Sequence, residues 1–421
     1  MAVNVNRFYL GCLAHASYMI DSNGIAAIID PQRDVDLYLE AAAERGVKIQ
    51  HVILTHLHAD FVSGHLELAE RTGAKIYLGA ESGAHFTHIP VRDGDTITLG
   101  RARMEFRQTP GHTLSCVSIV LTDLDAPAQP KCVFTGDTLF IGDVGRPDLS
   151  PSHTPQQLAE MLYHSLHDKL LTLPDETEVF PAHGAGSLCG RQMSNEASST
   201  IGKQRLTNYA LLARSPEEFV HLLTDHLPPR PEYFAQEVEI NRRGAVPIEQ
   251  LPELKAFSAA EVRKLQSEGA VAHVPGSLHI ALTGQYASWA ARILGLDRQL
   301  IISGEDPEHV RESQLRLARV GVENVVGYLD GGITGWIQNG NTLDYIPHVT
   351  AQEFDELRAA EPDNIVLIDV REPGEFASGA IPGALSIPLG DLARRATELD
   401  PAKLNVVCCK GGYRSSIASS I

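Results

Sequence analysis

The sequence predicts an α/β protein with more than one domain. Short apolar runs suited to buried strands alternate with segments of helical spacing along the 421 residues, a pattern typical of sheets covered by helices. A chain of this length is expected to divide into two or three domains, each with its own core. Residues 274–282 are matched by residues 381–389, so the C-terminal half is predicted to contain two related modules.

Composition excludes several classes of partner. With 35 Lys and Arg against 53 Asp and Glu, the chain carries a formal charge of −18, which argues against nucleic acid and anionic membrane surfaces. The sequence contains no run of about 18 apolar residues, and its N-terminus lacks the pattern of a secretory signal. Six cysteines make no disulfide framework in so long a chain. We expect a cytoplasmic enzyme with no membrane and no nucleic-acid partner, assembled as a homo-oligomer.

The first 250 residues are expected to fold as one domain of mixed strands and helices. Residues 16–20 and 25–30 flank an Asn-Gly turn, which predicts a β-hairpin. Helices are predicted to end at Gly46 and Gly73, because glycine commonly follows the last turn of a helix. Further short strands are predicted over residues 52–54, 76–78, 117–121, 133–134 and 179–180.

Side chains that bind metals follow several of these strands. Loops at one edge of a sheet can converge, so ligands at successive strand ends can reach one ion. Imidazole and carboxylate groups suit zinc and iron, and a His-x-His pair on a tight turn can direct two rings to the same ion. The predicted metal site draws on His56, His58, Asp60, His112, Asp137 and His183. Other histidines of this region are expected to be ordinary surface or core residues: His51, His65, His85 and His88.

These motifs resemble the metallo-β-lactamase superfamily over about the first 250 residues, which implies an αββα sandwich. The superfamily signature His-x-His-x-Asp-His reads His-Leu-His-Ala-Asp-Phe from His56 onward. Phe61 therefore stands where the hydrolases of that superfamily place a ligand for a second metal. This departure argues against a binuclear zinc hydrolase.

Two longer stretches, 136–149 and 183–190, are similar to persulfide dioxygenases fused to rhodanese domains. That resemblance implies one Fe(II) per chain, held by His56, His112 and Asp137. Two imidazoles and one carboxylate leave open positions on the ion for substrate and oxygen. Zinc is the alternative metal, because the other three side chains of the predicted site are also present. Those three are expected either to orient the ligands and substrate or to hold a second metal.

Two arginines lie in or beside these stretches, Arg146 and Arg191. The paired N–H donors of a guanidinium group would let either arginine bind a substrate carboxylate or phosphate. A structural or solvated role is the alternative interpretation for each.

The C-terminal half begins after a stretch of low periodicity. Residues 227–252 are predicted to form a linker or a strap on the first domain. Beyond them, residues 255–343 and 348–421 both resemble rhodanese domains. In the last module, residues 365–369 predict a buried strand, and residues 406–408 predict a second strand parallel to it.

The loop after that second strand has the features of a reactive-thiol site. Cys409 is followed by two glycines and, five positions on, by Arg414. The resemblance to rhodaneses makes Cys409 and Arg414 the predicted catalytic residues. Backbone N–H groups around a thiol at a helix start lower its pKa, whereas Cys408 on the strand is expected to be inert. The chain stops seven residues after Arg414, and we expect the natural chain to continue.

The middle module is predicted to be catalytically inactive. Ser303 or Gly304 stands where the last module has its thiol, and residues 268–272 leave too little chain for a strand before the repeat. We expect this module to pack against or position its neighbours. Residues 329–336 resemble the closing segment of a rhodanese domain, a segment that the last module lacks.

The resemblance implies a persulfide dioxygenase fused to a sulfurtransferase, acting in sulfide detoxification. Oxygen would oxidise a low-molecular-weight thiol persulfide to sulfite, and Cys409 would carry a sulfane sulfur that can join sulfite as thiosulfate. The carrier thiol is left open between glutathione, coenzyme A, bacillithiol and others. Two other functions also stay open: a binuclear zinc thioesterase of the glyoxalase II type, and a sulfide-responsive binding scaffold.

Overall fold

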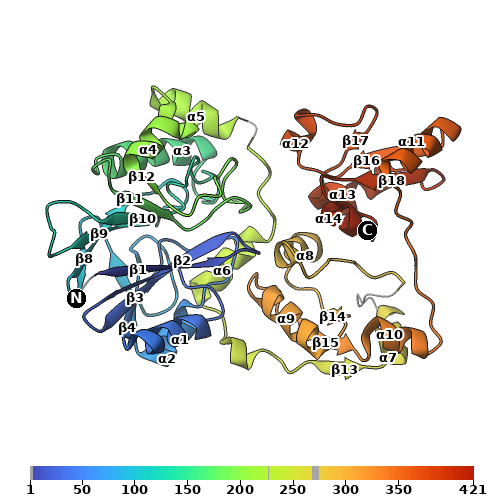
Figure 1. The fold of residues 1–421 in the computed structure, drawn as a ribbon, viewed down its shortest axis with the longest axis horizontal. Coiled ribbons are helices and arrows are strands. Elements are labelled where there is room, and N and C mark those ends of the chain that lie inside the picture. Colours follow the sequence, from blue (N-terminus) through green and yellow to red (C-terminus); the bar gives the residue numbers. More distant parts are fainter. Residues whose placement is uncertain (1–2, 226, 268–274) are drawn as a thin grey trace. The chain divides into compact units, whose positions relative to one another are not determined.

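The computed structural model of the chain describes residues 3–225, 227–267 and 275–421. The chain forms two compact units, one of Met1–Leu251 with Ala318–Gly321 and the other of Pro252–Leu317 with Val322–Ile421. Both units combine strands with helices (Figure 1), so the predicted α/β class is confirmed. The division into domains at 1–250, 255–343 and 348–421 stays a prediction. Among the described residues, no helix is long and apolar enough to cross a membrane.

Two six-stranded sheets form the centre of the first unit. In one sheet the strands lie in chain order: β1 (Asn4–Leu10), β2 (His15–Ser22), β3 (Ile25–Ile29), β4 (Lys48–Ile53), β5 (Lys75–Gly79) and β6 (Ile89–Val91). The other sheet has the order β12 (Ser199–Thr200), β11 (Glu178–Pro181), β10 (Cys132–Gly136), β9 (Val117–Asp123), β8 (Ala102–Gln108) and β7 (Thr96–Leu99). Neighbouring strands from β3 to β6 are parallel, as are β10 and β11, and the remaining neighbours are antiparallel.

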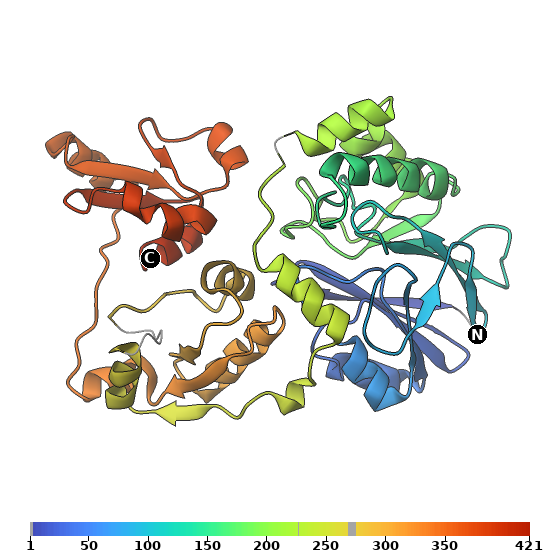
Figure 2. The ribbon, with the colours of Figure 1, turned by 180° about the vertical axis from the view of Figure 1, so that it is seen from behind.

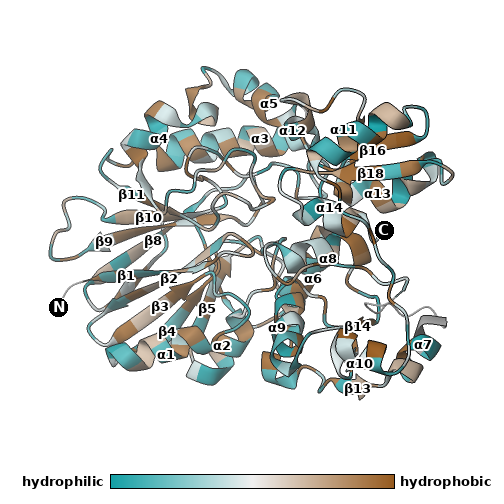
Figure 3. Cartoon of the chain, turned by 45° about the vertical axis from the view of Figure 1, so that its right-hand side comes forward, coloured by the Kyte–Doolittle hydropathy of each residue, from teal (hydrophilic) through white to brown (hydrophobic). Residues whose placement is uncertain are grey.

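Helices pack on the outer faces of both sheets and complete the predicted αββα sandwich. The first sheet carries α1 (Asp36–Arg45) and α2 (His65–Thr72), and the second carries α3 (Pro155–His164), η1 (Ser165–Leu170), α4 (Ile201–Thr207), η2 (Tyr209–Leu212) and α5 (Pro216–Thr224). Tyr18 and Phe106 pack between the sheets, Tyr38 of α1 packs on the first sheet, and Leu162 of α3 packs on the second. Figure 3 shows the strands of this unit as largely hydrophobic, with hydrophilic residues on its helices.

The glycines singled out in the sequence lie at a hairpin turn and at two helix ends. β2 and β3 pair antiparallel across Asn23 and Gly24, whose φ angles of 51° and 80° are both positive. Such angles belong to the two-residue turn that joins twisted strands, and they favour Asn-Gly. Helices α1 and α2 end at Gly46 and Gly73, both in the left-handed conformation. The predicted hairpin and both predicted helix ends are therefore confirmed.

The stretch predicted as a linker or strap belongs to the first unit and contains a helix, α6 (Phe234–Arg243), followed by η3 (Ile248–Gln250). Figures 1 and 2 both show α6 beside the strands of this unit. The buried residues of α6 are Phe234, Glu237 and Asn241. Two of these three are polar, so the buried face gives no apolar periodicity and the helix could not be recognised from hydrophobic spacing.

The second unit contains two three-stranded parallel sheets. One has the order β13 (Lys255–Phe257), β15 (Val325–Leu329), β14 (Leu300–Ile302), with helices α7 (Ala259–Ser267), α8 (Tyr286–Leu294), α9 (Pro307–Ala318) and α10 (Gly332–Gln338) in the same segment. The other has the order β17 (Leu385–Ser386), β16 (Ile365–Asp369), β18 (Leu404–Cys408), with α11 (Ala351–Ala360), α12 (Pro373–Ala377), α13 (Leu389–Arg395), η4 (Ala396–Glu398) and α14 (Tyr413–Ala418).

The two strands predicted in the last module are β16 and β18, and they pair in parallel, with Asp369 opposite Cys408. The loop that begins at Cys409 therefore starts at the carboxyl end of the sheet. The inference about a missing strand rests on residues 268–272, which lie outside the described residues, as does the first residue of the repeat at 274.

Candidate metal centre and thiol site

Three buried side chains converge where loops of the two sheets of the first unit meet. His56 follows β4, His112 lies between β8 and β9, and Asp137 follows β10. The Oδ2 atom of Asp137 lies 3.4 Å from Nε2 of His112 and 3.9 Å from Nε2 of His56. Within the described part of the chain, none of these three atoms has a hydrogen-bond partner. Because an unpaired buried polar atom is costly, this donor set fits one metal ion.

Hydrogen bonds orient both imidazole rings toward this point. Nδ1 of His112 donates to the carbonyl oxygen of Arg146 at 3.0 Å. The Thr55 hydroxyl donates to Asp30 at 2.8 Å, so it accepts from Nδ1 of His56 at 3.0 Å. With the proton fixed on Nδ1, each ring presents the lone pair of Nε2. Burial also lowers the pKa of both histidines, which favours the neutral rings that bind metals.

Two glycines allow the ligand loops to approach this closely. A Cβ atom on Gly136, whose φ is +52°, would lie 2.6 Å from the Thr55 hydroxyl. A Cβ atom on Gly145 would lie 2.0 Å from the carbonyl oxygen of Asp137 and 2.9 Å from Nδ1 of His112. Any larger residue at either position would therefore displace a ligand or the group that orients it.

His183 lies between two carboxylates beside the three ligands. Its Nδ1 donates to Oδ1 of Asp137 at 2.8 Å, and its Nε2 lies 3.1 Å from Oδ2 of Asp60. Burial lowers the pKa of His183, but the two carboxylates outweigh burial and hold this pKa well above the ordinary value. Burial raises the pKa of Asp60, yet His183 brings it down to about 2. A protonated His183 thus engages Oδ1 of Asp137 and leaves Oδ2 for an ion.

His58 and Phe61 occupy the rest of this pocket. Nε2 of His58 lies 3.1 Å from Oδ1 of Asp30. His58 does not belong to the cluster of His56, His112 and Asp137. The Phe61 ring, 1% exposed, has its centroid 4.0 Å from that of His15 and 4.3 Å from that of His58. An apolar ring therefore fills the position where a sixth signature residue would offer an imidazole.

Helix α6 holds the loop that carries these residues. The side-chain amide of Asn241 donates to the carbonyl oxygens of His58 at 2.9 Å and Phe61 at 2.8 Å. Its Oδ1 accepts from the backbone N–H of Ser63 at 2.8 Å. Asn241 is 1% exposed, so all these bonds are shielded from water. Sequence reasoning gave no role to Asn241.

Sequence reasoning also assigned no role to two further residues at the site, Asp30 and Cys189. Asp30 accepts hydrogen bonds from the backbone N–H and the hydroxyl of Thr55. Cys189 brings its sulfur within 4.8 Å of ligand atoms of Asp60 and His183. Burial raises the pKa of the Cys189 thiol well above its ordinary value. The one available signal was the glycine-rich stretch after His183, which placed Cys189 near the loop of a predicted ligand.

The two arginines predicted to bind substrate both form hydrogen bonds with other residues of the chain. Arg146 donates to both oxygens of Asp148, at 2.6 and 2.8 Å, and to the carbonyl oxygen of Pro228 at 2.8 Å. Arg191 donates to backbone carbonyl oxygens near the end of α5, including that of Leu223. These contacts favour the structural interpretation for both residues.

A cavity of about 580 Å³ adjoins the loops of the metal cluster. Leu57, Ala59 and Thr113, which are chain neighbours of His56, His58 and His112, form part of its wall. Arg230 and Arg242 also line it, together with Ser82, Ser115, Ser150 and Ser152. The cavity thus combines two arginines, one glutamate (Glu81) and several hydroxyl groups beside the loops of the predicted metal site.

Hydrogen-bond donors surround the Cys409 sulfur in the last module. The backbone N–H of Gly412 donates to the sulfur of Cys409 at 3.1 Å, and the Ser415 hydroxyl lies 3.4 Å from that sulfur. Burial raises the pKa of Cys409, but these hydrogen bonds outweigh burial and lower the pKa below its ordinary value. Burial raises the pKa of Cys408 to about 11.

Arg414 has a partner other than the thiol. Its guanidinium group forms a bidentate ion pair with Glu375, with N–O distances of 2.5 and 2.9 Å. Hydrogen bonds from Arg414 lower the pKa of Glu375 to about 2. The depressed pKa of Cys409 therefore comes from the loop N–H groups and Ser415, and Arg414 holds the loop to helix α12.

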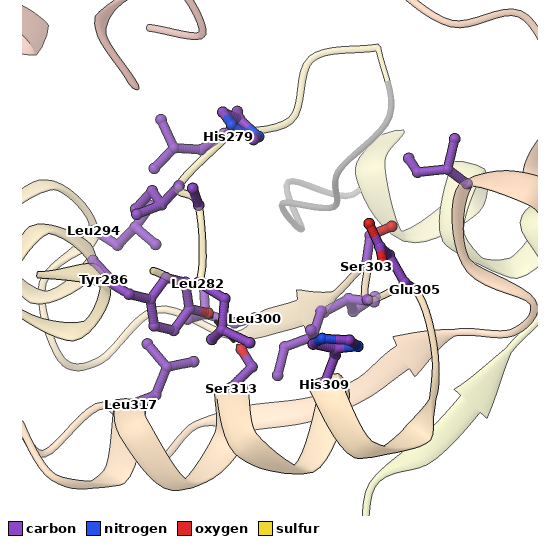
Figure 4. Close-up of a pocket in the computed structure, with 18 residues that line it drawn as sticks. His279, Leu282, Tyr286, Leu294, Leu300, Ser303, Glu305, His309, Ser313 and Leu317 are labelled. Carbon is purple, nitrogen blue, oxygen red and sulfur yellow. Dashed lines mark hydrogen bonds between the residues drawn. The ribbon is translucent and has the colours of Figure 1, made fainter. Parts of the chain in front are cut away.

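The corresponding loop of the middle module carries no thiol. After β14 come Ser303, Gly304 and Glu305, which line a cavity of about 430 Å³. Figure 4 shows Ser303 and Glu305 at one side of this cavity and Tyr286 and Leu282 at another. The residues that line it are mostly apolar and include no cysteine.

Sequence profiles of two families match the chain. The metallo-β-lactamase superfamily matches residues 10–183, and the rhodanese-like domain matches residues 213–339 and 350–421. The mitochondrial persulfide dioxygenase ETHE1 of Bos taurus is 35% identical over 224 residues, which are 52% of this chain and 78% of that protein. The chain belongs to the persulfide dioxygenase–rhodanese fusions. Its family makes it an oxidoreductase with a sulfurtransferase-type domain.

Solved structures agree with this family. A metallo-β-lactamase from Staphylococcus aureus superposes with a TM-score of 0.69 at 30% identity, covering 78% of this fusion protein and 99% of that chain. ETHE1 from Myxococcus xanthus superposes with a TM-score of 0.50 at 31% identity, covering 57% and 98%. The hydroxyacylglutathione hydrolase of Methylococcus capsulatus is also a relative, 32% identical over 247 residues, which are 58% of this chain and 89% of that protein.

The contrast between the two adjacent cysteines leads to a prediction about this fusion protein. Near neutral pH, iodoacetamide should alkylate Cys409 at least about 10-fold faster than Cys408, because the higher thiolate fraction of Cys409 outweighs its lower intrinsic nucleophilicity. Peptide mass spectrometry after short exposures measures both rates, and a Cys409→Ser variant assigns the slow signal. Equal rates for the two cysteines would contradict the pKa difference on which this prediction depends.

Proposed function

We propose that the chain is a non-haem iron persulfide dioxygenase coupled to sulfur transfer in sulfide detoxification in the cytoplasm. The observation that carries this proposal is the convergence of three buried, unpartnered atoms on His56, His112 and Asp137. The net reaction converts a thiol persulfide, oxygen and water into the thiol, sulfite and two protons. Oxygen is the four-electron oxidant, and the S–S bond of the persulfide is the bond that breaks.

Two imidazoles and one carboxylate on one face are typical of non-haem Fe(II) oxygenases. Iron bound by these residues would supply the redox chemistry that oxygen needs to react with the terminal sulfur. The protein's part is to hold the three ligands rigidly and to keep the site dry. The hydrogen bonds to the Nδ1 atoms of His56 and His112 hold these rings in place, and complete burial of both residues keeps water away from them.

His183 limits the site to one ion in this proposal. A protonated imidazole has no lone pair for a metal, and the two flanking carboxylates keep His183 protonated. Asp60 is engaged by His183, and the Phe61 ring fills the remaining position. His183 also holds a proton on Nδ1, which it donates to Oδ1 of Asp137.

A binuclear zinc thioesterase is the second candidate function, favoured by the hydrolase among the relatives. It would require the cluster of Asp60, His183 and Cys189 to bind a second ion. That cluster would first have to lose protons from both His183 and Cys189, whose pKa values are raised. This cost favours the single-metal proposal.

The cavity beside the metal cluster is the proposed site for the carrier part of the persulfide. Arg242 forms an ion pair with Glu239 at 2.7 Å, and the Arg242 side chain is 35% exposed. Solvent weakens such an ion pair, so the guanidinium group keeps N–H donors available to a ligand in the cavity. Arg230 lies in the same wall. Two arginines and several hydroxyl groups suit a carrier with carboxylate or phosphate groups, such as glutathione or coenzyme A.

The last module would process the sulfur products. A persulfide on Cys409 would transfer its outer sulfur to sulfite, which breaks one S–S bond, forms another, and releases thiosulfate and the free thiol. The low pKa of Cys409 makes it a good leaving group for that step. We further propose that the chain assembles as a homo-oligomer.

The metal proposal predicts that Asp137→Ala abolishes iron binding and persulfide-dependent oxygen uptake together, because removing the carboxylate leaves only two of the three ligands. Anaerobic purification, metal quantitation and an oxygen electrode measure both properties. The matched control is Asp143→Asn, a buried carboxylate that bonds to Tyr209 and backbone N–H groups instead of the cluster. Full iron occupancy in Asp137→Ala would refute the ligand assignment, and two zinc ions per wild-type chain with thioester cleavage would support the hydrolase.

The cavity predicts that Arg242→Gln raises the KM for glutathione or coenzyme A persulfide roughly tenfold with little change in kcat, because a charge-assisted contact to the carrier is lost. Arg243→Gln is the matched control, since Arg243 also pairs with Glu239 but is 62% exposed and does not line the cavity. Steady-state oxygen uptake on anionic and neutral persulfides tests this. A KM increase of equal size for a neutral persulfide would argue against charge recognition.

The two sites should be separable by mutation. Cys409→Ser should eliminate thiosulfate formation from persulfide and sulfite, while iron content and sulfite production stay near those of the wild type. The reason is that the thiol and the metal ligands belong to different units of the chain. Ion chromatography of sulfite and thiosulfate measures both products, and a parallel loss of oxygen uptake would place the thiol within the dioxygenase reaction.

A further inference from the structure

The middle module packs against the thiol module within the second unit. Trp289 of α8, 7% exposed, belongs to the same apolar cluster as Ile368, Val370 and Ile417 of the last module. Leu278, Ile280 and Ile293 of the middle module also pack on this cluster, as do Tyr413 and Cys409. The apolar face behind the catalytic loop is therefore covered in part by residues from the preceding module.

One hydrogen bond joins the catalytic loop itself to the middle module. The hydroxyl of Tyr413, the first residue of α14, donates to the carbonyl oxygen of Ala281 at 3.0 Å. The Tyr413 ring lies against Gly284, where an added Cβ would be 3.4 Å from a ring carbon. Tyr413 directly follows Gly412, whose N–H donates to the Cys409 sulfur. The contact to Ala281 thus fixes the turn that presents this donor to the sulfur.

Two more polar contacts join the middle module to the last module beside this apolar cluster. Arg292 of α8 forms an ion pair with Glu372 at 3.0 Å, and its guanidinium lies 5.0 Å from the centre of the Trp289 ring. A Cβ on Gly390 would lie 2.2 Å from Nε of Arg292, so the last module has a glycine where this arginine crosses it. The backbone N–H of His279 donates to the Ser420 hydroxyl at 2.9 Å, beyond the end of α14.

We propose that the middle module, which has no thiol in its own loop, positions the Cys409 loop, with Tyr413 and Trp289 as the positioning residues. Neither residue is required to touch substrate. Tyr413 holds the first turn of α14 through Ala281, and Trp289 supplies the apolar support beneath the loop. The inference rests on the proposed sulfur-transfer role of Cys409 and explains why a module without a nucleophile accompanies the catalytic one.

Charged groups of both modules lie around the catalytic loop: Arg316 of the middle module interacts electrostatically with Tyr413, and Arg292 pairs with Glu372. Arg414 and Cys408 interact electrostatically with Cys409, and Glu375 neutralises Arg414. Tyr413→Phe leaves these groups in place and removes a single hydroxyl. Any change in thiol reactivity would then report a shift of the loop N–H donors relative to the sulfur.

The test compares the full-length wild type with Tyr413→Phe. Loss of the hydrogen bond should lower the rate of sulfur transfer from thiosulfate to cyanide about 3- to 10-fold and move the midpoint of Cys409 alkylation up by about 0.5 pH unit. Iron content and oxygen uptake should not change. Tyr345→Phe is the matched control, because Tyr345 is 82% exposed. Trp289→Leu, whose substituted residue belongs to the middle module, should change both readouts in the same direction.

The outcomes separate this inference from the proposed function. Wild-type values of both readouts in Tyr413→Phe and in a folded Trp289→Leu would overturn the positioning role while leaving the sulfurtransferase proposal intact. A wild type that transfers no sulfur would refute the proposed function of Cys409, and the alkylation midpoint would still decide whether Tyr413 sets the loop. If Trp289→Leu fails to unfold cooperatively with heat, Tyr413→Phe decides the question alone.

Discussion

The buried carboxylate of Asp137 is the point on which the arrangement of the first unit depends. A carboxylate deep inside a sandwich of two sheets is stable only when charge and hydrogen bonds compensate it. His183, from the loop after β11, provides this compensation on one oxygen, and His56 and His112 face the other. The ligand loops come from both sheets, so this one compensated charge fixes how the two sheets meet at their loop edge.

The hydrogen-bond acceptors and glycines around Asp137 are needed to bring the two histidine rings to this carboxylate. Each imidazole needs its outer nitrogen occupied by an acceptor, which the Thr55 hydroxyl and the Arg146 carbonyl supply. Close approach of these loops needs residues without a side chain at Gly136 and Gly145. The family relationship and this geometry agree on a metal-dependent oxidoreductase, and the iron and its substrate are the proposed parts of that account.

Local signals in the sequence predicted much of this fold. Asn-Gly and glycine stops gave the β2–β3 hairpin and the ends of α1 and α2, and apolar runs gave β16 and β18. The side chains of the predicted metal site stand in short sequence motifs, so they could be proposed without a structure. The structure brings His56, His112 and Asp137 into one cluster and places His183, Asp60 and His58 around it.

The rest could not be predicted, because it depends on contacts between residues far apart in the chain. Asp30 and Asn241 are single polar residues whose partners lie 25 or more positions away, and no motif marks them. Helix α6 buries Glu237 and Asn241, which conceals it from a search for apolar spacing. Arg146 and Arg191 were chosen as possible anion binders for their chemistry alone, and their hydrogen bonds to carbonyl oxygens became visible only in three dimensions.

Helix α6 also bears on how this domain could have been joined to others during evolution. Beyond its Asn241 contacts, Val246 accepts a hydrogen bond from Arg33 at 2.6 Å, and the backbone N–H of Ile248 donates to Glu67 at 2.9 Å. The sandwich is thus closed by residues about 65 positions past His183. A gene fusion that dropped these residues would have left the metal loop without its support, so they belong to the first unit although the rhodanese-like family match begins at residue 213.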